Sequence, residues 1–226
     1  ELVSEATRKL IREQKLRTPI ISSACPAVVR LIKIRFPELC DNVMPLLAPI
    51  EVAARMARRK VISMTGLPDE EIGVFFITPC PAKMTAIRSP LGQKKSAVDG
   101  AISMLDIYGL LRPIISHLEK EGLPEGTSTG YGIGWATSGG EATALFNDEY
   151  LAADGIENVI NVLEQIENGN IPQVKFIELD ACTAGCVGGV LTVQNPYIAK
   201  TRLQSLRRYL PVSKNFLSRS EERRVG

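Results

Sequence analysis

The feature that most constrains the fold is a unit that occurs three times: a short apolar run that ends in a cysteine-containing loop. The runs lie at residues 18–21, 72–78 and 174–179, and segments with helical spacing separate them. The continuous run at 72–78 is typical of a strand buried on both faces. Because strands that alternate with helices indicate largely parallel pairing, we predict an α/β fold.

The helices can be placed by the spacing of apolar residues and by the residues at their ends. Pro26 can begin a helix that continues over residues 27–36, and Gly169 is a natural stop for a later one. The predicted helices span residues 49–60, 98–118 (split in two at Pro113), 151–169 and 197–210, and a long glycine-rich loop spans 121–141.

The cysteine loops carry the chemistry that this sequence offers. They read Ser22-Ser23-Ala24-Cys25-Pro26, Thr78-Pro79-Cys80-Pro81-Ala82-Lys83 and Cys182-Thr183-Ala184-Gly185-Cys186-Val187-Gly188-Gly189. Thiolates are soft ligands, and iron–sulfur clusters are usually held by four of them. The C-x3-C spacing with adjacent glycines disfavours zinc, whose knuckles use C-x2-C. The alternative, that each cysteine is a small buried side chain, stays open at this point.

Neighbouring residues add to the metal-site interpretation. Proline flanks Cys25 and Cys80, which fixes the shape of a thiolate loop because proline presets φ and removes a donor. Lys83 is either an exposed lysine or a cation turned inward onto an anionic cofactor. Cys40 lacks such a setting, so we predict a helix-terminal thiol without a metal role.

Composition narrows the partners and the compartment. The chain has 226 residues with 27 basic and 25 acidic side chains, so no polyanion such as nucleic acid is indicated as a partner. The arginines near the end, within residues 202–224, are typical of a solvated amphipathic tail. No apolar run approaches the roughly 20 residues that span a bilayer, and no signal peptide is visible, so we expect no membrane association. Five cysteines without a secretory signal indicate reduced thiols in the cytoplasm.

A glycine-rich segment and the single histidine give weaker indications of function. The segment at residues 130–140 is rich in glycine but lacks the G-x-G-x-x-G register of a nucleotide-binding loop, and its Trp135 is a candidate pocket wall. His117, the single histidine, is expected to have a surface or capping role rather than to bind a metal.

Together and in order, the three loops resemble the cluster-binding domain of the iron–iron (FeFe) hydrogenases. That family has T-S-C-C-P, M-P-C-x-x-K-x-x-E and E-x-M-x-C-x-x-G-C-x-x-G-G, where this chain has S-S-A-C-P, T-P-C-P-A-K-M-T-A and E-L-D-A-C-T-A-G-C-V-G-G. The segment Arg35-Phe36-Pro37-Glu38-Leu39 is also similar. The resemblance runs from about Glu5 to Pro211 and implies two lobes of mostly parallel sheet flanked by helices, with the iron–sulfur site in the cleft between them.

The resemblance also implies the cofactors and the residues that bind them. The ligands of a 4Fe-4S cluster would be Cys25, Cys80, Cys182 and Cys186, and Cys186 would bridge to a two-iron centre with CO, cyanide and dithiolate ligands. Lys83 would hydrogen-bond a cyanide ligand of that centre. The matching pocket-lining positions are Pro49, Pro79, Trp135 and Ala136.

The departures from the family concern proton transfer. The cysteine that passes protons in active members is replaced by Ala24, the relay glutamate by Ala86 and the relay serine by Met44. None of these side chains can carry a proton, so no catalytic residue is assigned. Two pocket methionines become Thr78 and Asp180, Glu141 falls at an apolar pocket position, and the G-G-G-Q-P ending is replaced. These changes resemble those of the sensory hydrogenases.

The leading hypothesis is therefore an H-cluster domain that senses dihydrogen or redox state, with weak hydrogen turnover. One alternative is a conventional ferredoxin-linked hydrogenase with another proton route, through Glu141 or Asp180. Another is a relative of the 4Fe-4S scaffold proteins, against which Lys83 argues. Expected partners are a ferredoxin-like electron donor or attached iron–sulfur domains, dihydrogen and protons, and a sensor or signalling domain.

We expect residues 1–226 to form one H-cluster domain that ends in a charged tail at 212–226. The start at Glu1, within a helix-like segment and without a methionine, leads us to expect a fragment. The family's domain has an upstream segment that completes one pocket wall. Whether this chain alone holds the two-iron centre therefore stays open.

Overall fold

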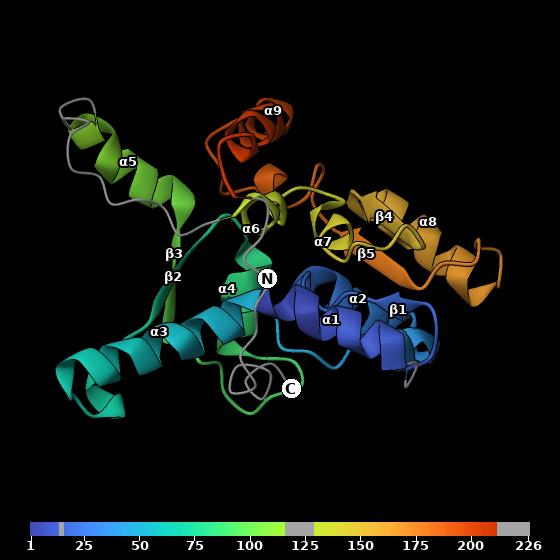
Figure 1. Cartoon of the computed structure of the whole chain (residues 1–226), viewed down its shortest axis with the longest axis horizontal. Coiled ribbons are helices and arrows are strands. Elements are labelled where there is room, and N and C mark those ends of the chain that lie inside the picture. Colours follow the sequence, from blue (N-terminus) through green and yellow to red (C-terminus); the bar gives the residue numbers. More distant parts are fainter. Residues whose placement is uncertain (14–15, 116–128, 212–226) are drawn as a thin grey trace.

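The computed structural model of the protein describes residues 1–13, 16–115 and 129–211. Its framework consists of two separate parallel sheets, each packed against helices (Figure 1). This confirms the predicted α/β class with parallel pairing in two lobes. The predictions for His117, for the loop at 121–128 and for the tail at 212–226 concern residues outside this description.

The larger sheet contains β1 (Ile20–Ile21), β4 (Tyr150–Asp154) and β5 (Phe176–Asp180). The strand order is β1-β5-β4, and Phe176 pairs with Ile20 on one side and with Tyr150 on the other. β5 is the central strand, and its first four residues are buried. The strands predicted around residues 18–21 and 174–179 are thus confirmed.

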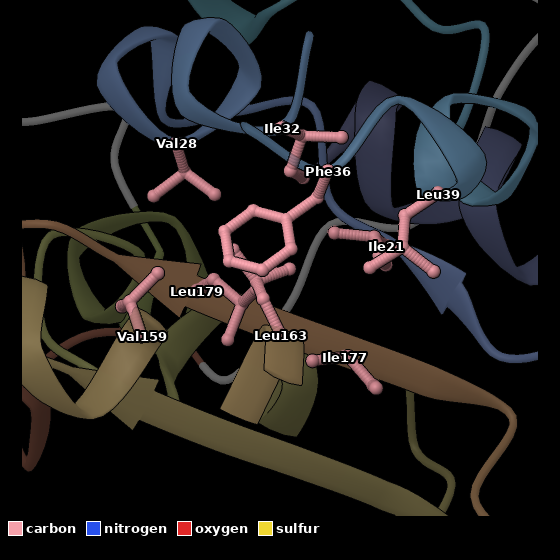
Figure 2. Packing of buried hydrophobic residues seen from close by; sticks show 9 residues of the cluster. All are labelled: Ile21, Val28, Ile32, Phe36, Leu39, Val159, Leu163, Ile177 and Leu179. Atoms are coloured by element: carbon pink, nitrogen blue, oxygen red, sulfur yellow. The ribbon is translucent and has the colours of Figure 1, made fainter. Parts of the chain in front are cut away.

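One face of this sheet packs against α2 (Pro26–Arg35), the 3-10 helix η1 (Pro37–Asn42) and α8 (Ile156–Glu167). Pro26 is the first residue of α2, as predicted, because its fixed φ suits a helix start and its missing N–H needs no partner there. Figure 2 shows the ring of Phe36 pointing toward Leu163 and Leu179. Each such side chain, when fully buried, contributes about 1.5–3 kcal/mol. The buried members of this cluster are Ile21, Val28, Ile32, Phe36, Leu39, Val159, Leu163, Ile177 and Leu179.

The other face of the sheet packs against α1 (Leu2–Glu13) and α7 (Gly140–Thr143). Ile20 and Phe176 lie in this second cluster, whereas the next residue of each strand lies in the first, as the alternation of side chains along a strand requires. Met44 and Val3 complete its centre. The sheet is therefore covered on both faces.

The smaller sheet pairs β2 (Phe75–Thr78) with β3 (Gly100–Ser103), and α4 (Pro81–Arg88) and α5 (Met104–Ile115) contact both strands. The strand predicted at 72–78 exists, but the prediction that both its faces are buried is wrong. Phe75 and Ile77 are 63% and 46% exposed. The cause is the size of the sheet, since the ring of Phe75 covers Gly100 on the single neighbouring strand instead of lying under a further layer.

Several boundaries differ from the sequence-based expectations. Within residues 98–115, β3 stands where the first predicted helix should begin, and α5 continues past Pro113, which lies in its last turn. Residues 151–154 belong to β4 instead of the predicted helix. Gly155, at φ +83°, turns the chain into α8. The predicted stop at Gly169 is confirmed, because this residue has φ +69° just beyond the helix.

The remaining elements are α3 (Pro49–Thr65), the 3-10 helices η2 (Asp69–Glu71) and η3 (Cys186–Gly188), α6 (Gly130–Gly134) and α9 (Pro196–Arg207). The segment at 129–141, predicted as loop, contains α6 and the start of α7. The hydroxyl of Thr129 begins α6 by accepting the N–H of Gly132 at 3.1 Å. Within the described ranges, no helix combines the length and apolarity needed to cross a bilayer.

Candidate metal centre

Each cysteine loop follows the carboxyl end of a parallel strand. Cys25 comes after β1 and Cys80 after β2, and each is the residue just before a helix that begins with proline. Cys182 follows β5, and Cys186 begins η3. The two sheets thus contribute ligand candidates to one place, because β1 and β5 belong to the larger sheet and β2 to the smaller.

Lys83 lies next to three of these cysteines, Cys186, Cys80 and Cys25. Its Nζ is 3.4 Å from the Sγ of Cys186. Burial alone would lower the pKa of Lys83, but the negative charges of Cys186, Cys80 and Cys25 outweigh burial and raise it. The ammonium group is thus favoured next to thiolates such as those of a metal-bound state, and the side chain as a whole is partly buried.

The thiols also act on one another. Burial first, and then the charges of Cys80, Cys25 and Cys186, raise the pKa of Cys182 to about 11. Burial likewise raises the pKa of Cys186 and of Cys25, the latter against backbone N–H groups that include Ala181. Without a metal these groups are thus neutral thiols near pH 7. Metal binding would release their protons.

The third loop fits so tightly that three of its positions exclude any side chain. A Cβ on Gly188 would come within 1.9 Å of the carbonyl oxygen of Thr183, and one on Gly189 within 2.6 Å of that of Pro79. Gly185 has φ +85°, and a Cβ there would meet the backbone N of Ser138 at 2.5 Å. The glycines therefore let the loop fold back against its surroundings.

The loop is held from both sides by backbone hydrogen bonds. Leu191 donates its N–H to the oxygen of Pro79 at 3.1 Å, and Val187 donates to the oxygen of Ala136 at 3.0 Å. Two of the four predicted pocket-lining residues thus contact this loop. The third, Trp135, donates its indole N–H to the Oγ of Ser4 at 3.0 Å and packs against the second hydrophobic cluster.

Buried hydroxyl groups shape the first two loops. The Oγ1 of Thr78 accepts the N–H of Cys80 at 3.1 Å, and the Oγ of Ser22 accepts the N–H of Ala24 at 3.1 Å. Both hydroxyls are nearly inaccessible to solvent. Thr78, which stands at a family methionine position, therefore has a structural role in this chain.

Buried carboxyl groups lie behind the cysteines. Glu141 is 3% exposed, its Oε2 accepts the hydroxyl of Ser22 at 2.6 Å, and its Oε1 has no hydrogen-bond partner among the residues that the structure describes. Burial, reinforced by the charge of Asp180, raises the pKa of Glu141 to about 8, against the effects of Ser22 and Lys83. Burial also raises the pKa of Asp180, to about 6.

Glu178, the first residue of the third motif, accepts hydrogen bonds from two backbone N–H groups. Its carboxylate oxygens accept the N–H groups of Gly139 at 3.0 Å and Ala142 at 2.8 Å, so that it satisfies the start of α7. Burial raises its pKa, and these two N–H groups oppose that shift. Glu178 thereby ties the segment that carries Ala136 to β5, which carries the third cysteine loop.

The three positions that we predict to replace proton-relay residues lie at one cavity. Ala24, Met44 and Ala86 all line a cavity of about 360 Å³, and so does Lys83. Pro49, the fourth predicted pocket residue, begins α3 between Ala48 and Ile50, which also line it. Cys40 lies in η1 and borders the same cavity.

The donor set fits an iron–sulfur cluster. Four thiols share one electrostatic neighbourhood, the loop around two of them leaves no room for side chains, and a buried cation faces them. Among the described residues, no three Cys, His, Asp or Glu side chains converge on a point that one metal ion could occupy. A cluster is a larger group that its thiolates surround. Lys83 is also placed to donate to an anionic ligand next to Cys186.

Sequence analysis missed three polar residues that support the loops. They are Ser22, Glu178 and Asp154. Ser22 links Ala24 to Glu141, and the Oδ2 of Asp154 accepts the N–H of Ala184 at 2.6 Å. An Asp-Gly pair at the end of an apolar run is the signal that could have indicated the turn at Asp154. The partners of Ser22 and Glu178 are distant in sequence, so no local signal marks them.

Comparison with known proteins places these features in a family. The family model described as iron only hydrogenase large subunit, C-terminal domain, matches residues 1–153 and 147–190. The NADP-reducing hydrogenase subunit HndD of Solidesulfovibrio fructosivorans is 23% identical over 232 residues, which cover 84% of this chain and 39% of that protein. Iron hydrogenase 1 of Clostridium pasteurianum is 22% identical over 231 residues, which cover 83% of this chain and 40% of that protein. The chain thus spans about two fifths of the length of these relatives.

Solved structures show the same fold. A variant of the FeFe-hydrogenase HydA1 from Chlamydomonas reinhardtii matches with a TM-score of 0.63 at 16% sequence identity. The match covers 98% of this chain and 73% of the other.

Proposed function

Because the chain belongs to the family of the iron-only hydrogenase large subunit, C-terminal domain, we propose that it binds an H-cluster and senses dihydrogen or redox state, with little hydrogen turnover. One observation carries this proposal. Four cysteines share one electrostatic neighbourhood and three of them act on the partly buried Lys83, whereas the cavity wall beside them presents Ala24, Met44 and Ala86. The cofactor cradle is retained while the side chains that would move protons to it are absent from these positions.

In this proposal the cysteines hold the metal groups and Lys83 orients them. The 4Fe-4S cluster would be bound by Cys25, Cys80, Cys182 and Cys186, and Cys186 would also bridge to the two-iron centre. When bound, that centre supplies the chemistry of splitting or forming dihydrogen. Lys83, charged and 3.4 Å from Cys186, would donate to a cyanide ligand next to that thiolate.

Slow turnover follows from the cavity wall. General acid–base transfer needs a group within hydrogen-bond reach that can gain and lose a proton. Methyl groups and a thioether supply none, so proton delivery along this side would be slow. A sensor needs only a change in the redox state of the cluster. A ferredoxin-like donor or an attached iron–sulfur domain would exchange electrons with the cluster, and a signalling domain would transmit the change.

The test measures hydrogen evolution by matured protein, divided by its content of two-iron centre as determined from infrared bands. We expect turnover far below that of an ordinary member measured in parallel, and only partial recovery in Ala24→Cys, because Met44 and Ala86 would still interrupt the path. Turnover as fast as that of the ordinary member would contradict the proposal.

A conventional hydrogenase is the second candidate, and the state of Glu141 favours it. This carboxyl is buried, keeps its proton near neutral pH and hydrogen-bonds Ser22, which in turn accepts the N–H of Ala24. It could therefore give protons from the other side of the cysteine loop. Under this candidate, Glu141→Gln would abolish pH-dependent turnover, whereas the sensory proposal predicts little change from an already low rate.

A scaffold that binds only a 4Fe-4S cluster is a weaker candidate. Lys83 is partly buried and charged, which has an energetic cost unless an anion faces it. The cluster thiolates supply part of that charge, and a cyanide ligand would supply more. Absence of CO and cyanide bands from fully matured protein would favour the scaffold.

A further inference from the structure

Two arginines line a hollow between α6 and α9, and none of the lining residues belongs to the candidate metal centre. The two helices contact each other (Figure 1). This α6–α9 hollow, of about 270 Å³, is lined by Gly130, Tyr131, Gln204, Arg207 and Arg208. None of these side chains is acidic. Among the described residues, neither guanidinium forms an ion pair with a carboxylate.

The chain around the hollow is basic. Residues 181–211 contain Lys200, Arg202, Arg207 and Arg208 but no aspartate or glutamate. The whole chain, by contrast, has 27 basic and 25 acidic side chains, so positive charge is concentrated in this segment. A local excess of positive charge attracts anions, and it forms a binding site where hydrogen-bond donors are also held in place.

The guanidinium of Arg207 is held in place by an aromatic stack. Its Cζ lies 5.8 Å from the ring centroid of Tyr131. The ring of Phe146 packs edge-on against Tyr131 with the centroids 4.8 Å apart, and the guanidinium of Arg8 lies over Phe146 at 5.0 Å. Gly134 leaves room for Arg207, because a Cβ at this glycine would come within 3.2 Å of that Cζ. Among the described residues no oxygen accepts an N–H of Arg207, so these donors are available to a ligand.

Stabilisation of the helix end does not account for this arrangement. Cations near the last turn of a helix offset the partial negative charge of its terminal carbonyl groups. In α9, the oxygens of Ser205, Leu206 and Arg207 already accept backbone N–H groups from residues 208–210. The N–H of Gly130, at the other side of the hollow, likewise donates to the oxygen of Pro211 at 2.8 Å. The donors left over in the hollow are therefore side chains.

We propose that the α6–α9 hollow binds a phosphate group. The planar forks of Arg207 and Arg208 match phosphate oxygens, and the phenol of Tyr131 and the amide of Gln204 each carry a further donor. A phosphate offers three or four oxygens to donors from four side chains, whereas a carboxylate offers two. The hollow is slightly smaller than the roughly 300–1,000 Å³ of sites for drug-sized ligands, so it suits one phosphate group with any remainder of the molecule outside.

A phosphate in this hollow would join two elements that hold the third cysteine loop. On one side, α9 contacts η3, which begins at Cys186. On the other side, the segment after α6 binds the loop through two hydrogen bonds, because Val187 donates its N–H to the oxygen of Ala136 and Ser138 donates to the oxygen of Ala184, each at 3.0 Å. Binding of phosphate would therefore stabilise the loop from a distance.

The test is a titration of inorganic phosphate into the isotope-labelled, reduced full chain, followed by NMR. Ionic strength is held constant with chloride, so that general screening does not change during the titration. We expect saturable shifts of the backbone amides of Gly130 and Gln204 and of the Nε–H of Arg207. At saturation, the amide N–H of Val187 should exchange more slowly with solvent, and unchanged exchange would overturn the coupling to the loop.

Arg207→Gln should weaken phosphate binding at least about tenfold, because it removes a charged donor pair from the hollow. The matched control is Arg202→Gln, which removes the same charge from the same helix. Arg202 is exposed, donates to the Oε1 of Gln194 at 2.8 Å and does not line the hollow, so the control should bind as the wild type does. Arg208→Gln, at an exposed position, should also weaken binding and decides the matter if Arg207→Gln does not fold.

Absence of saturable shifts in the wild type, or an equal loss of affinity in Arg202→Gln, would overturn the site. Acetate that binds as tightly as phosphate would overturn the assignment to phosphate. Glycerol 3-phosphate distinguishes the two sources of the group, since tighter binding than inorganic phosphate indicates an organic phosphate and equal binding indicates the free anion. The site requires no cluster, so the rate of hydrogen turnover tests the proposed function without bearing on this proposal.

Discussion

Replacing Glu141 by glutamine should change the pH dependence of stability in a predictable direction. Glu141 is 3% exposed, and burial raises its pKa to about 8, whereas an unfolded chain would titrate it near 4.5. A raised native pKa means that the native state holds this proton more tightly. Its contribution to stability is therefore complete below pH 4.5 and is lost as the pH rises through 8.

The magnitude follows from the two pKa values. One pKa unit corresponds to about 1.4 kcal/mol, so the wild type should lose about 3–4 kcal/mol between pH 5 and pH 8 through this group alone. Glutamine keeps a neutral polar group next to Ser22 but binds no proton. The free energy of unfolding of Glu141→Gln should thus depend less on pH by about that amount, and slightly less still because the charge of Glu141 no longer raises the pKa of Glu178.

The assay is urea unfolding of metal-free, reduced protein at several pH values between 5 and 8.5. Glu157→Gln is the control, because Glu157 is an exposed carboxylate in the first turn of α8. It should leave the pH dependence unchanged. If the curves of wild type and Glu141→Gln run parallel, the buried carboxyl does not hold a proton in the native state and the reasoning fails.

The remaining predictions concern the cysteine pocket. Cys186→Ser should strongly lower the iron and sulfide content after anaerobic reconstitution, because Cys186 faces Lys83. Cys40→Ser should leave both contents unchanged. Equal losses in the two variants would contradict the ligand assignment. Lys83→Met should keep the 4Fe-4S absorption but reduce the infrared bands of the two-iron centre; unchanged bands would remove its assigned role. Gly188→Ala should lower both the midpoint of thermal unfolding and the cluster content, because its Cβ would lie 1.9 Å from a backbone oxygen of the same loop. The control Gly66→Ala adds its Cβ in open space, so it should cost only about 1 kcal/mol of stability from its positive φ. Similar effects of the two substitutions would refute the argument that the loop is too tight for a side chain.

The cysteine loops and most helices were predictable because their signals are local. Proline after Cys25 fixes a helix start, and Gly169 supplies the positive φ that ends α8. The resemblance of the three motifs indicates the family from the sequence alone. Sequence reasoning therefore located the ligand candidates and the strands that lead into them.

Other features depend on contacts that no local pattern contains. Residues 151–154 fit the apolar spacing of the following helix, and only pairing with β5 makes them a strand. Phe75 looks like a core residue, yet its sheet has a single neighbouring strand. Glu141 lies in a glycine-rich segment that suggests a surface loop, and its burial results from packing against β1 and the segment after it.

The infrared spectrum of fully matured, full-length protein tests the central claim most directly. We expect bands of bound CO and cyanide that shift when dihydrogen is added. Such a spectrum would show that the cradle around Lys83 holds the complete cluster and responds to the gas. A protein that incorporates the 4Fe-4S cluster but shows no CO or cyanide bands under conditions that mature an ordinary member would contradict the account.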